Sequence, residues 1–281
     1  MKLFSRLFAT DMRHGLHSYL PLLGLVVAIS IFECFVSYAS IMANNLDVNS
    51  LGFADFAFAL FAGMEQFEYV DVQQFSFPMA WLMLLCAIAC STLVYPVHDL
   101  DGMGSRFIAV TGNRWIWWLS KCLWTIAGVL GLCLISLGVC AAATCMTGGC
   151  FSFDPTPEIN RLLNVYGVGS TSVNGSLLGF VLLLPCAISA LLILQLTVSL
   201  LINPAAGFLT TTTLLLASAY YTSPLLLGNY LMAARLDIAL ANGLTPANGA
   251  LLALSSILLC ILVGGFVFAR RDIMGRKGSF L

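Results

Sequence analysis

Charged residues are scarce in this chain of 281 residues. Only 9% of the residues are charged, 60% are hydrophobic, and the mean hydropathy is +0.96. A soluble domain needs more charge than this to cover its surface, so the composition predicts an integral membrane protein. The formal net charge is only −1, and no basic tract is present. The sequence therefore gives no indication of a nucleic-acid partner.

Several motifs of catalysis and metal binding are also missing. The chain has no GxxxxGK[ST], so it is not expected to hydrolyse ATP through a P-loop of its own. It has no HExxH and no GxSxG, which disfavours a zinc peptidase and a serine hydrolase. The ten cysteines include no CxxC, which disfavours a structural zinc site. Cys145 and Cys150 either bridge or remain free thiols, and free thiols are favoured. No cofactor is expected.

Long hydrophobic runs are the most prominent feature that is present. A helix that crosses the hydrocarbon core needs about 20 apolar residues, and backbone amides must be paired within lipid. The runs predict an all-α polytopic membrane protein with six transmembrane helices in a single transmembrane domain, residues 1–281. The predicted spans are residues 19–43, 77–97, 116–146, 177–202, 206–227 and 247–269.

The basic residues predict the orientation. Lys and Arg accumulate on the cytoplasmic side of membrane proteins. With the N-terminus inside, ten of the 12 basic residues face the cytoplasm, and only Arg161 and Arg235 lie outside. Both termini are therefore expected to be cytoplasmic, in a multi-pass protein of the cell membrane.

Two flanking segments have amphipathic patterns. Residues 1–18 place apolar side chains on one helical side and Lys2, Arg6, Asp11 and Arg13 on much of the other. This pattern predicts a helix at the inner membrane surface, with lipid as its partner, and with Gly15 and Pro21 allowing a bend into the first span. Residues 228–246 alternate apolar and polar residues, which predicts an outer amphipathic segment.

The loop at 98–115 concentrates much of the remaining polarity. Basic residues and tryptophans at the ends of spans account for part of it, since both anchor helices at membrane interfaces. They do not explain the order of acids, glycines, an apolar "FIAV" and a "TGN" break. That order predicts a short helix, a turn and the entry to the next span. Such a helix can dock on another protein and move both neighbouring spans.

These residues resemble the permease subunits of ABC transporters of the ABC-2 type, as do the "RRDI" ending at 270–273 and the overall layout. The loop residues that carry the resemblance are Asp99, Asp101, Gly102, Arg106, Thr111, Gly112, Asn113, Arg114 and Lys121. One departure from the family's pattern is that an aspartate stands where the loop usually has a glutamate.

The resemblance implies a subunit without its own catalytic site. Its partners would be two copies of an ATP-binding cassette ATPase and a second permease, identical or homologous. The segment 98–115 would act as a coupling helix, and the substrate would be a peptide, a drug or a lipid-like molecule. Small permeases of this kind often accompany bacteriocin or lantibiotic export and self-protection, or multidrug efflux.

Glu33 is the one acid well inside a predicted span. A charged carboxylate is costly there, so Glu33 either contacts a substrate pathway or is satisfied by a neighbouring helix. Two other functions remain open at this point. One is a polytopic intramembrane enzyme, which would need an acid, base or metal cluster around Glu33. The other is a membrane sensor or scaffold without a cassette partner.

Overall fold

The structure is a computed structural model that describes residues 2–64, 77–156, 176–240 and 242–270. The described residues form helices and contain no strand. The α-helices are α1 (Lys2–Ala43), α2 (Phe53–Phe61), α3 (Met79–Asp101), α4 (Met103–Thr111), α5 (Arg114–Thr147), α7 (Leu178–Leu201), α8 (Pro204–Tyr220) and α9 (Pro246–Arg270). Three short 3-10 helices are η1 (Val48–Ser50), η2 (Leu227–Leu231) and η3 (Ala233–Arg235).

Five helices are long and apolar enough to cross a membrane. They are Tyr19–Ala43 within α1, and the whole of α3, α5, α7 and α9. Their residues correspond to five of the six predicted runs. The chain is therefore an all-helical, multi-pass membrane protein. The residues that follow Arg270, including most of the "RRDI" stretch, lie outside the described residues.

The helix α8, which corresponds to the remaining predicted run at 206–227, is shorter than that run. It begins at Pro204 because the Asn203 side chain caps it, accepting a 2.6 Å hydrogen bond from the Ala206 amide. It ends at Tyr220, shortly before Pro224, whose ring restricts the preceding residue to extended backbone. Its 17 residues extend about 26 Å, slightly less than the ~30 Å hydrocarbon core.

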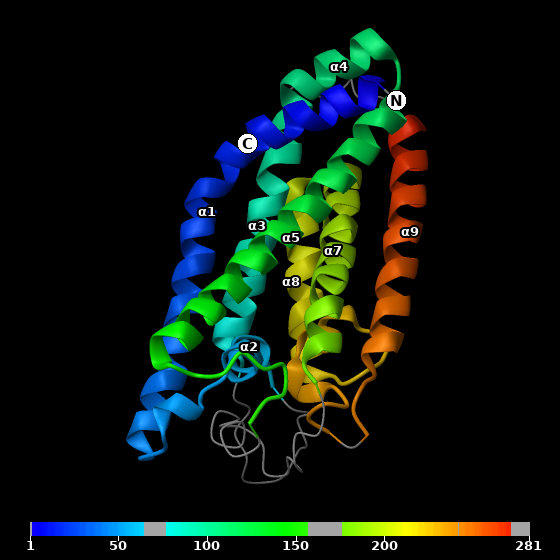
Figure 1. Cartoon of the computed structure of the whole chain (residues 1–281). Coiled ribbons are helices and arrows are strands. Elements are labelled where there is room, and N and C mark those ends of the chain that lie inside the picture. The colour runs from blue at the N-terminus through cyan, green and yellow to red at the C-terminus, as the bar shows by residue number, and fades with distance from the viewer. Residues whose placement is uncertain (1, 65–76, 157–175, 241, 271–281) are drawn as a thin grey trace.

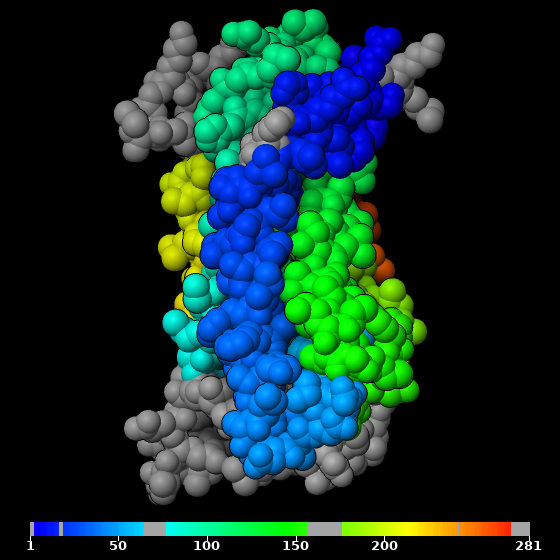
Figure 2. Space-filling model, turned by 60° about the vertical axis from the view of Figure 1, so that its left-hand side comes forward, coloured from blue at the N-terminus to red at the C-terminus, as the bar shows by residue number. Residues whose placement is uncertain are grey.

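The long helices form one bundle with two different ends (Figure 1). The helix α4 lies across one end, called here the α4 end. The helix α2 and the turns η2 and η3 close the opposite end, called here the α2 end. Along one face, α1 and α5 lie side by side (Figure 2).

The helix α1 includes both the predicted surface helix and the first span. It continues through Pro21, and Figure 1 shows its N-terminal part crossing obliquely over the α4 end. Gly15 allows close contact with α5, because a Cβ there would lie 2.4 Å from Trp124 Nε1. Asp11, which the sequence pattern places on the polar surface, is buried in the bundle. The N-terminal segment is thus packed on the protein as well as amphipathic.

The predicted outer amphipathic segment, 228–246, packs into the bundle at the α2 end. Residues 228–236 are all buried, and Asp237 is exposed. A segment lying on a membrane surface would expose one face along its length. The reason for the difference is the Arg235 side chain, which turns inward and bonds to backbone oxygens of other elements.

Candidate functional site

The loop between α3 and α5 contains the short helix α4. Gly102 joins α3 to α4, and the Thr111 hydroxyl donates a 2.7 Å hydrogen bond to the Phe107 carbonyl in the last turn. Gly112 then ends the helix with a φ of +66°, a conformation that favours glycine. Asn113 caps α5, since its Oδ1 accepts from the Ile116 amide at 3.1 Å. The "TGN" stretch is therefore a helix stop followed by a helix start.

Arg114, the first residue of α5, contacts the end of α9. Its Nη1 donates to the carbonyl oxygens of Ala269 at 3.1 Å and Phe268 at 3.4 Å. A cation is favourable at this position, because the last carbonyls of a helix lack partners within the helix. Asp101 and Arg106, two further charged residues of the predicted coupling segment, are exposed.

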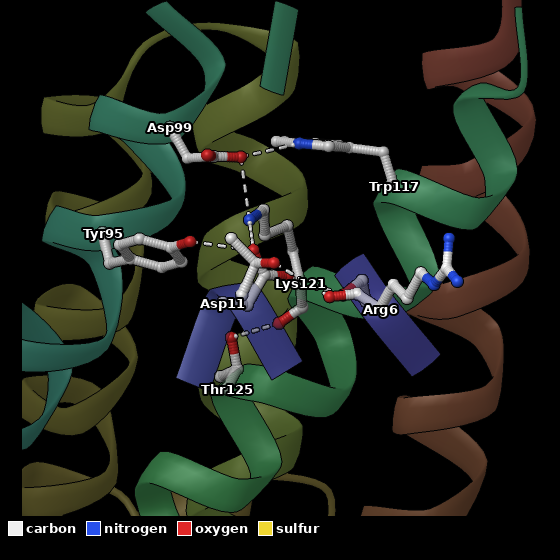
Figure 3. A network of polar contacts seen from close by, with 9 residues as sticks. Arg6, Asp11, Tyr95, Asp99, Trp117, Lys121 and Thr125 are labelled. Atoms are coloured by element: carbon white, nitrogen blue, oxygen red, sulfur yellow. Dashed lines mark hydrogen bonds and ion pairs between the residues drawn. The ribbon is translucent and has the colours of Figure 1, made fainter. Parts of the chain in front are cut away.

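Lys121 is the centre of a buried polar cluster at the α4 end (Figure 3). Its side chain is 0% exposed. Its Nζ lies 2.6 Å from Asp11 Oδ1, on α1, and 2.8 Å from Asp99 Oδ2, on α3. The ammonium on α5 therefore joins three helices. Asp11 belongs to the N-terminal segment of α1, and Asp99 lies at the end of α3, just before α4.

Neutral donors complete the cluster. The Tyr95 hydroxyl donates to Asp11 at 2.8 Å, and the Ser120 hydroxyl donates to Asp11 at 2.6 Å. The Trp117 indole N–H donates to Asp99 at 2.8 Å. These hydrogen bonds give the buried carboxylate oxygens partners in place of the water that burial excludes.

The aromatic rings also surround the ammonium. Lys121 Nζ lies 4.5 Å from the centre of the Tyr95 ring and 5.5 Å from that of Trp117, within range of cation–π attraction. The three charged side chains, two carboxylates and one ammonium, sum to −1. Loss of Lys121 would be costly, because it would leave two buried carboxylates without a counter-charge.

A groove separates α4 from the N-terminal segment of α1. It has a volume of about 450 Å³. Its walls are mostly apolar, and Asp11 and Asp99 lie along it together with Arg6 and Arg106. Figure 3 shows the Arg6 side chain directed away from Asp11. The charge cluster is therefore next to an open space beside α4.

Glu33 does not belong to this cluster. It lies in the same helix as Asp11 but 22 residues later, about 33 Å along a helix. It is half-buried, and within the described chain its carboxylate makes no hydrogen bond or ion pair. No group of three or more His, Cys, Asp or Glu side chains that could hold a metal is found among the described residues. Cys145 and Cys150 are free thiols.

The loop pattern includes Asp99 and Lys121 but does not pair them, and Asp11 is not among the predicted site residues. Asp11 and Lys121 are 110 positions apart. A local signal existed, because Asp11 is the only acid among the basic residues at 1–18 and Lys121 follows four residues after Trp117 inside an apolar helix. These two local signals together would predict an ion pair between Asp11 and Lys121.

Geometry and topology define a multi-pass helical membrane protein with a short helix and a buried charge cluster at one end. The chain belongs to the family described as "Protein of unknown function (DUF2705)", whose model matches residues 19–274. Tyr95, Asp99, Trp117 and Lys121 fall inside the matched region, and Asp11 precedes it. Neither a curated protein nor a solved structure matches the chain.

Proposed function

We propose that this chain is the permease subunit of an ATP-driven exporter of the ABC-2 type. In this proposal α8 serves as a sixth, short span, and both termini are cytoplasmic, so that α4 faces the cytoplasm. A separate ATP-binding cassette ATPase, in two copies, binds α4 and supplies the energy. A second permease copy or homologue completes the pathway for a peptide, drug or lipid-like substrate.

The observation that carries the proposal is the position of α4. This nine-residue helix connects α3 and α5 directly and lies beyond the end of the bundle. It exposes apolar side chains, with Val110 87% and Met103 62% exposed. Exposed apolar residues on a short amphipathic helix are typical of a protein-docking element.

The contacts on either side of α4 give it a means of moving the spans. At its start, Asp99 is bonded to Lys121 and through it to Asp11 on α1. At its end, Arg114 is bonded to the last carbonyls of α9. A force on α4 therefore acts on α1, α3, α5 and α9 through short polar contacts. This arrangement suits a subunit that receives mechanical work from a partner.

Charge supports the proposed orientation. Arg6, Arg106, Arg114, Lys121 and Arg270 are all at the α4 end, whereas Arg235 is at the α2 end. An excess of basic residues favours the cytoplasmic side. The exposed Arg6 and Arg106 also suit contact with anionic lipid or with an acidic partner surface.

The test compares two apolar residues of equal exposure at opposite ends of the molecule. Val110 is 87% exposed on α4, and Met146 is 88% exposed near the far end of α5. The parent chain, Val110→Asp and Met146→Asp are each purified in mild detergent together with candidate cassette ATPase subunits. We expect Val110→Asp to weaken ATPase binding by at least about tenfold, because a charge replaces an apolar contact. Met146→Asp should bind like the parent.

Two results would contradict the proposal. Equal ATPase binding by all three proteins would show that α4 is not the docking element. If the parent binds no cassette ATPase, the exporter assignment fails, and a membrane sensor or scaffold becomes the better hypothesis.

A further inference from the structure

The two carboxylates that bind Lys121 are held unequally, and Asp11 is the more firmly fixed. Its Oδ1 accepts hydrogen bonds from Lys121 and from the Tyr95 hydroxyl, and its Oδ2 accepts from the Ser120 hydroxyl. Its side chain is 1% exposed. Both oxygens are therefore satisfied within the protein, and the side chain is almost fully buried.

Asp99 has fewer partners and more exposure. Its Oδ2 accepts from both Lys121 and the Trp117 indole at 2.8 Å, and its Oδ1 has no hydrogen bond within the described residues. Its side chain is 9% exposed and lines the groove beside α4. Asp99 is thus held by fewer bonds than Asp11 and borders a space that water can enter.

The charge balance also favours release of Asp99. With both carboxylates present the cluster carries −1, whereas Lys121 and Asp11 alone form a neutral pair. A buried ion pair is tolerated when it is neutral and hydrogen-bonded, and excess buried charge is penalised. Departure of Asp99 costs two hydrogen bonds but leaves no unpaired buried charge behind.

The chain offers Asp99 a second position. The groove that it lines is also lined by Arg106 and Arg6, so the space has positive charges at its edges. Gly102, three residues after Asp99, joins α3 to α4 without a side chain. The end of α3 can therefore turn there with little steric hindrance.

We propose that Asp99 is a releasable latch between α4 and the bundle. In one position it binds Lys121 and Trp117, and α4 is held against the bundle. In the other it enters the groove and pairs with Arg106, while Asp11 and Lys121 remain paired. The latch is a property of the chain alone and stays testable whether or not an ATPase binds α4.

The first experiment measures amide hydrogen exchange by mass spectrometry on the purified chain in lipid nanodiscs. Asp99→Asn removes the ion pair but preserves the shape of the side chain. Amides of 103–111 should exchange about tenfold faster, because a charge-assisted hydrogen bond no longer closes the latch. Amides of 2–20 should exchange as in the parent, since Asp11 keeps Lys121.

The matched control is Asp101→Asn. Asp101 is an exposed carboxylate two residues away at the end of the same helix, so this change removes the same charge without breaking the cluster. Its exchange should equal that of the parent. Unchanged exchange of 103–111 in Asp99→Asn would overturn the proposal. So would faster exchange that extends to 2–20, because Asp99 would then be a fixed structural member of the cluster.

The second experiment tests the groove as the alternative position. Arg106→Gln removes the proposed partner and should slow exchange of 103–111 severalfold, because the released state loses its ion pair. Arg13→Gln, an exposed arginine outside the groove, serves as the control and should cause no change. Equal exchange in Arg106→Gln and the parent would show that Asp99 does not move to Arg106.

Discussion

Among the described residues, each end of this bundle buries one cation, and the two cations have different partners. At the α4 end, Lys121 is bonded to the carboxylates of Asp11 and Asp99. At the α2 end, Arg235 is 1% exposed, and its partners among the described residues are neutral oxygens. Its guanidinium donates to the carbonyls of Met64 at 2.8 Å, Ala219 at 2.7 Å and Ser218, and to the Asn229 side chain.

The backbone acceptors of Arg235 lie at the end of α8 and directly after α2. The Ser218 and Ala219 carbonyls are in the last turn of α8, where a cation is stabilised by the helix dipole. Met64 follows α2. Burial lowers the pKa of Arg235 to about 10, so the guanidinium remains charged at neutral pH.

The contrast teaches which end can change its contacts. Carbonyl oxygens are fixed in the backbone, and a planar guanidinium bonds to several of them only in one arrangement. The Lys121 ammonium can release Asp99 and keep Asp11 without leaving a buried charge unpaired. The contacts of Arg235 therefore keep the α2 end in one arrangement, whereas in our proposal the contacts of Lys121 change at the α4 end.

The largest effect is expected from Lys121→Met. This change leaves two buried carboxylates without a counter-charge and should lower the free energy of unfolding by about 3–5 kcal/mol. Thermal unfolding in detergent measures it. Adding Asp11→Asn and Asp99→Asn to the same chain removes the stranded charges and should restore most of the stability. If the triple variant is no more stable than Lys121→Met, charge balance does not govern the α4 end.

An intermediate effect is expected from Arg235→Lys at the α2 end. Lysine keeps the charge but cannot donate to the same set of acceptors, so buried carbonyls lose their partners. The free energy of unfolding should fall by about 2 kcal/mol. Asp237→Asn, a change at an exposed neighbour, should have no measurable effect in the same unfolding assay. Tolerance of lysine at 235 would mean that charge alone, without the guanidinium geometry, holds this end together.

The smallest effect is expected from Gly112→Ala, between α4 and α5. Gly112 has open space around it, but its φ of +66° strains any other residue, at a cost of about 1 kcal/mol. Gly131→Ala in α5 also meets open space, but its backbone is helical, so it should be neutral or slightly stabilising. Thermal unfolding of both variants isolates the backbone effect. Equal shifts would show that the α4–α5 joint imposes no conformational constraint.

Local sequence pattern predicted much of this fold. Five apolar runs correspond to five long helices, because hydropathy and length alone determine whether a helix suits a membrane. The "TGN" break predicted where α4 stops and α5 starts, since Gly112 and Asn113 act through their own backbone and side chain. These are properties that a residue carries with it.

Features that depend on distant partners could not be predicted in the same way. The local pattern places Asp11 on a polar surface, but its partner Lys121 is 110 residues away in the sequence and buries it. The segment 228–246 alternates polar and apolar residues, yet residues 228–236 are all buried, because Arg235 finds its acceptors next to α2 and at the end of α8. Pairings of this kind are set by how helices pack, and a single sequence does not contain them.

The length of α5 has one more consequence. Its 34 residues form an unbroken helix of about 51 Å, well beyond the thickness of a hydrocarbon core. Arg114 at one terminus is bonded to α9, and just past the other terminus the Cys150 carbonyl accepts a hydrogen bond from Phe53 at the start of α2. A tilt of α5 as one unbroken helix would move its contacts with α9 and with α2 together. A probe attached at one end of α5 should therefore report a movement at the other end.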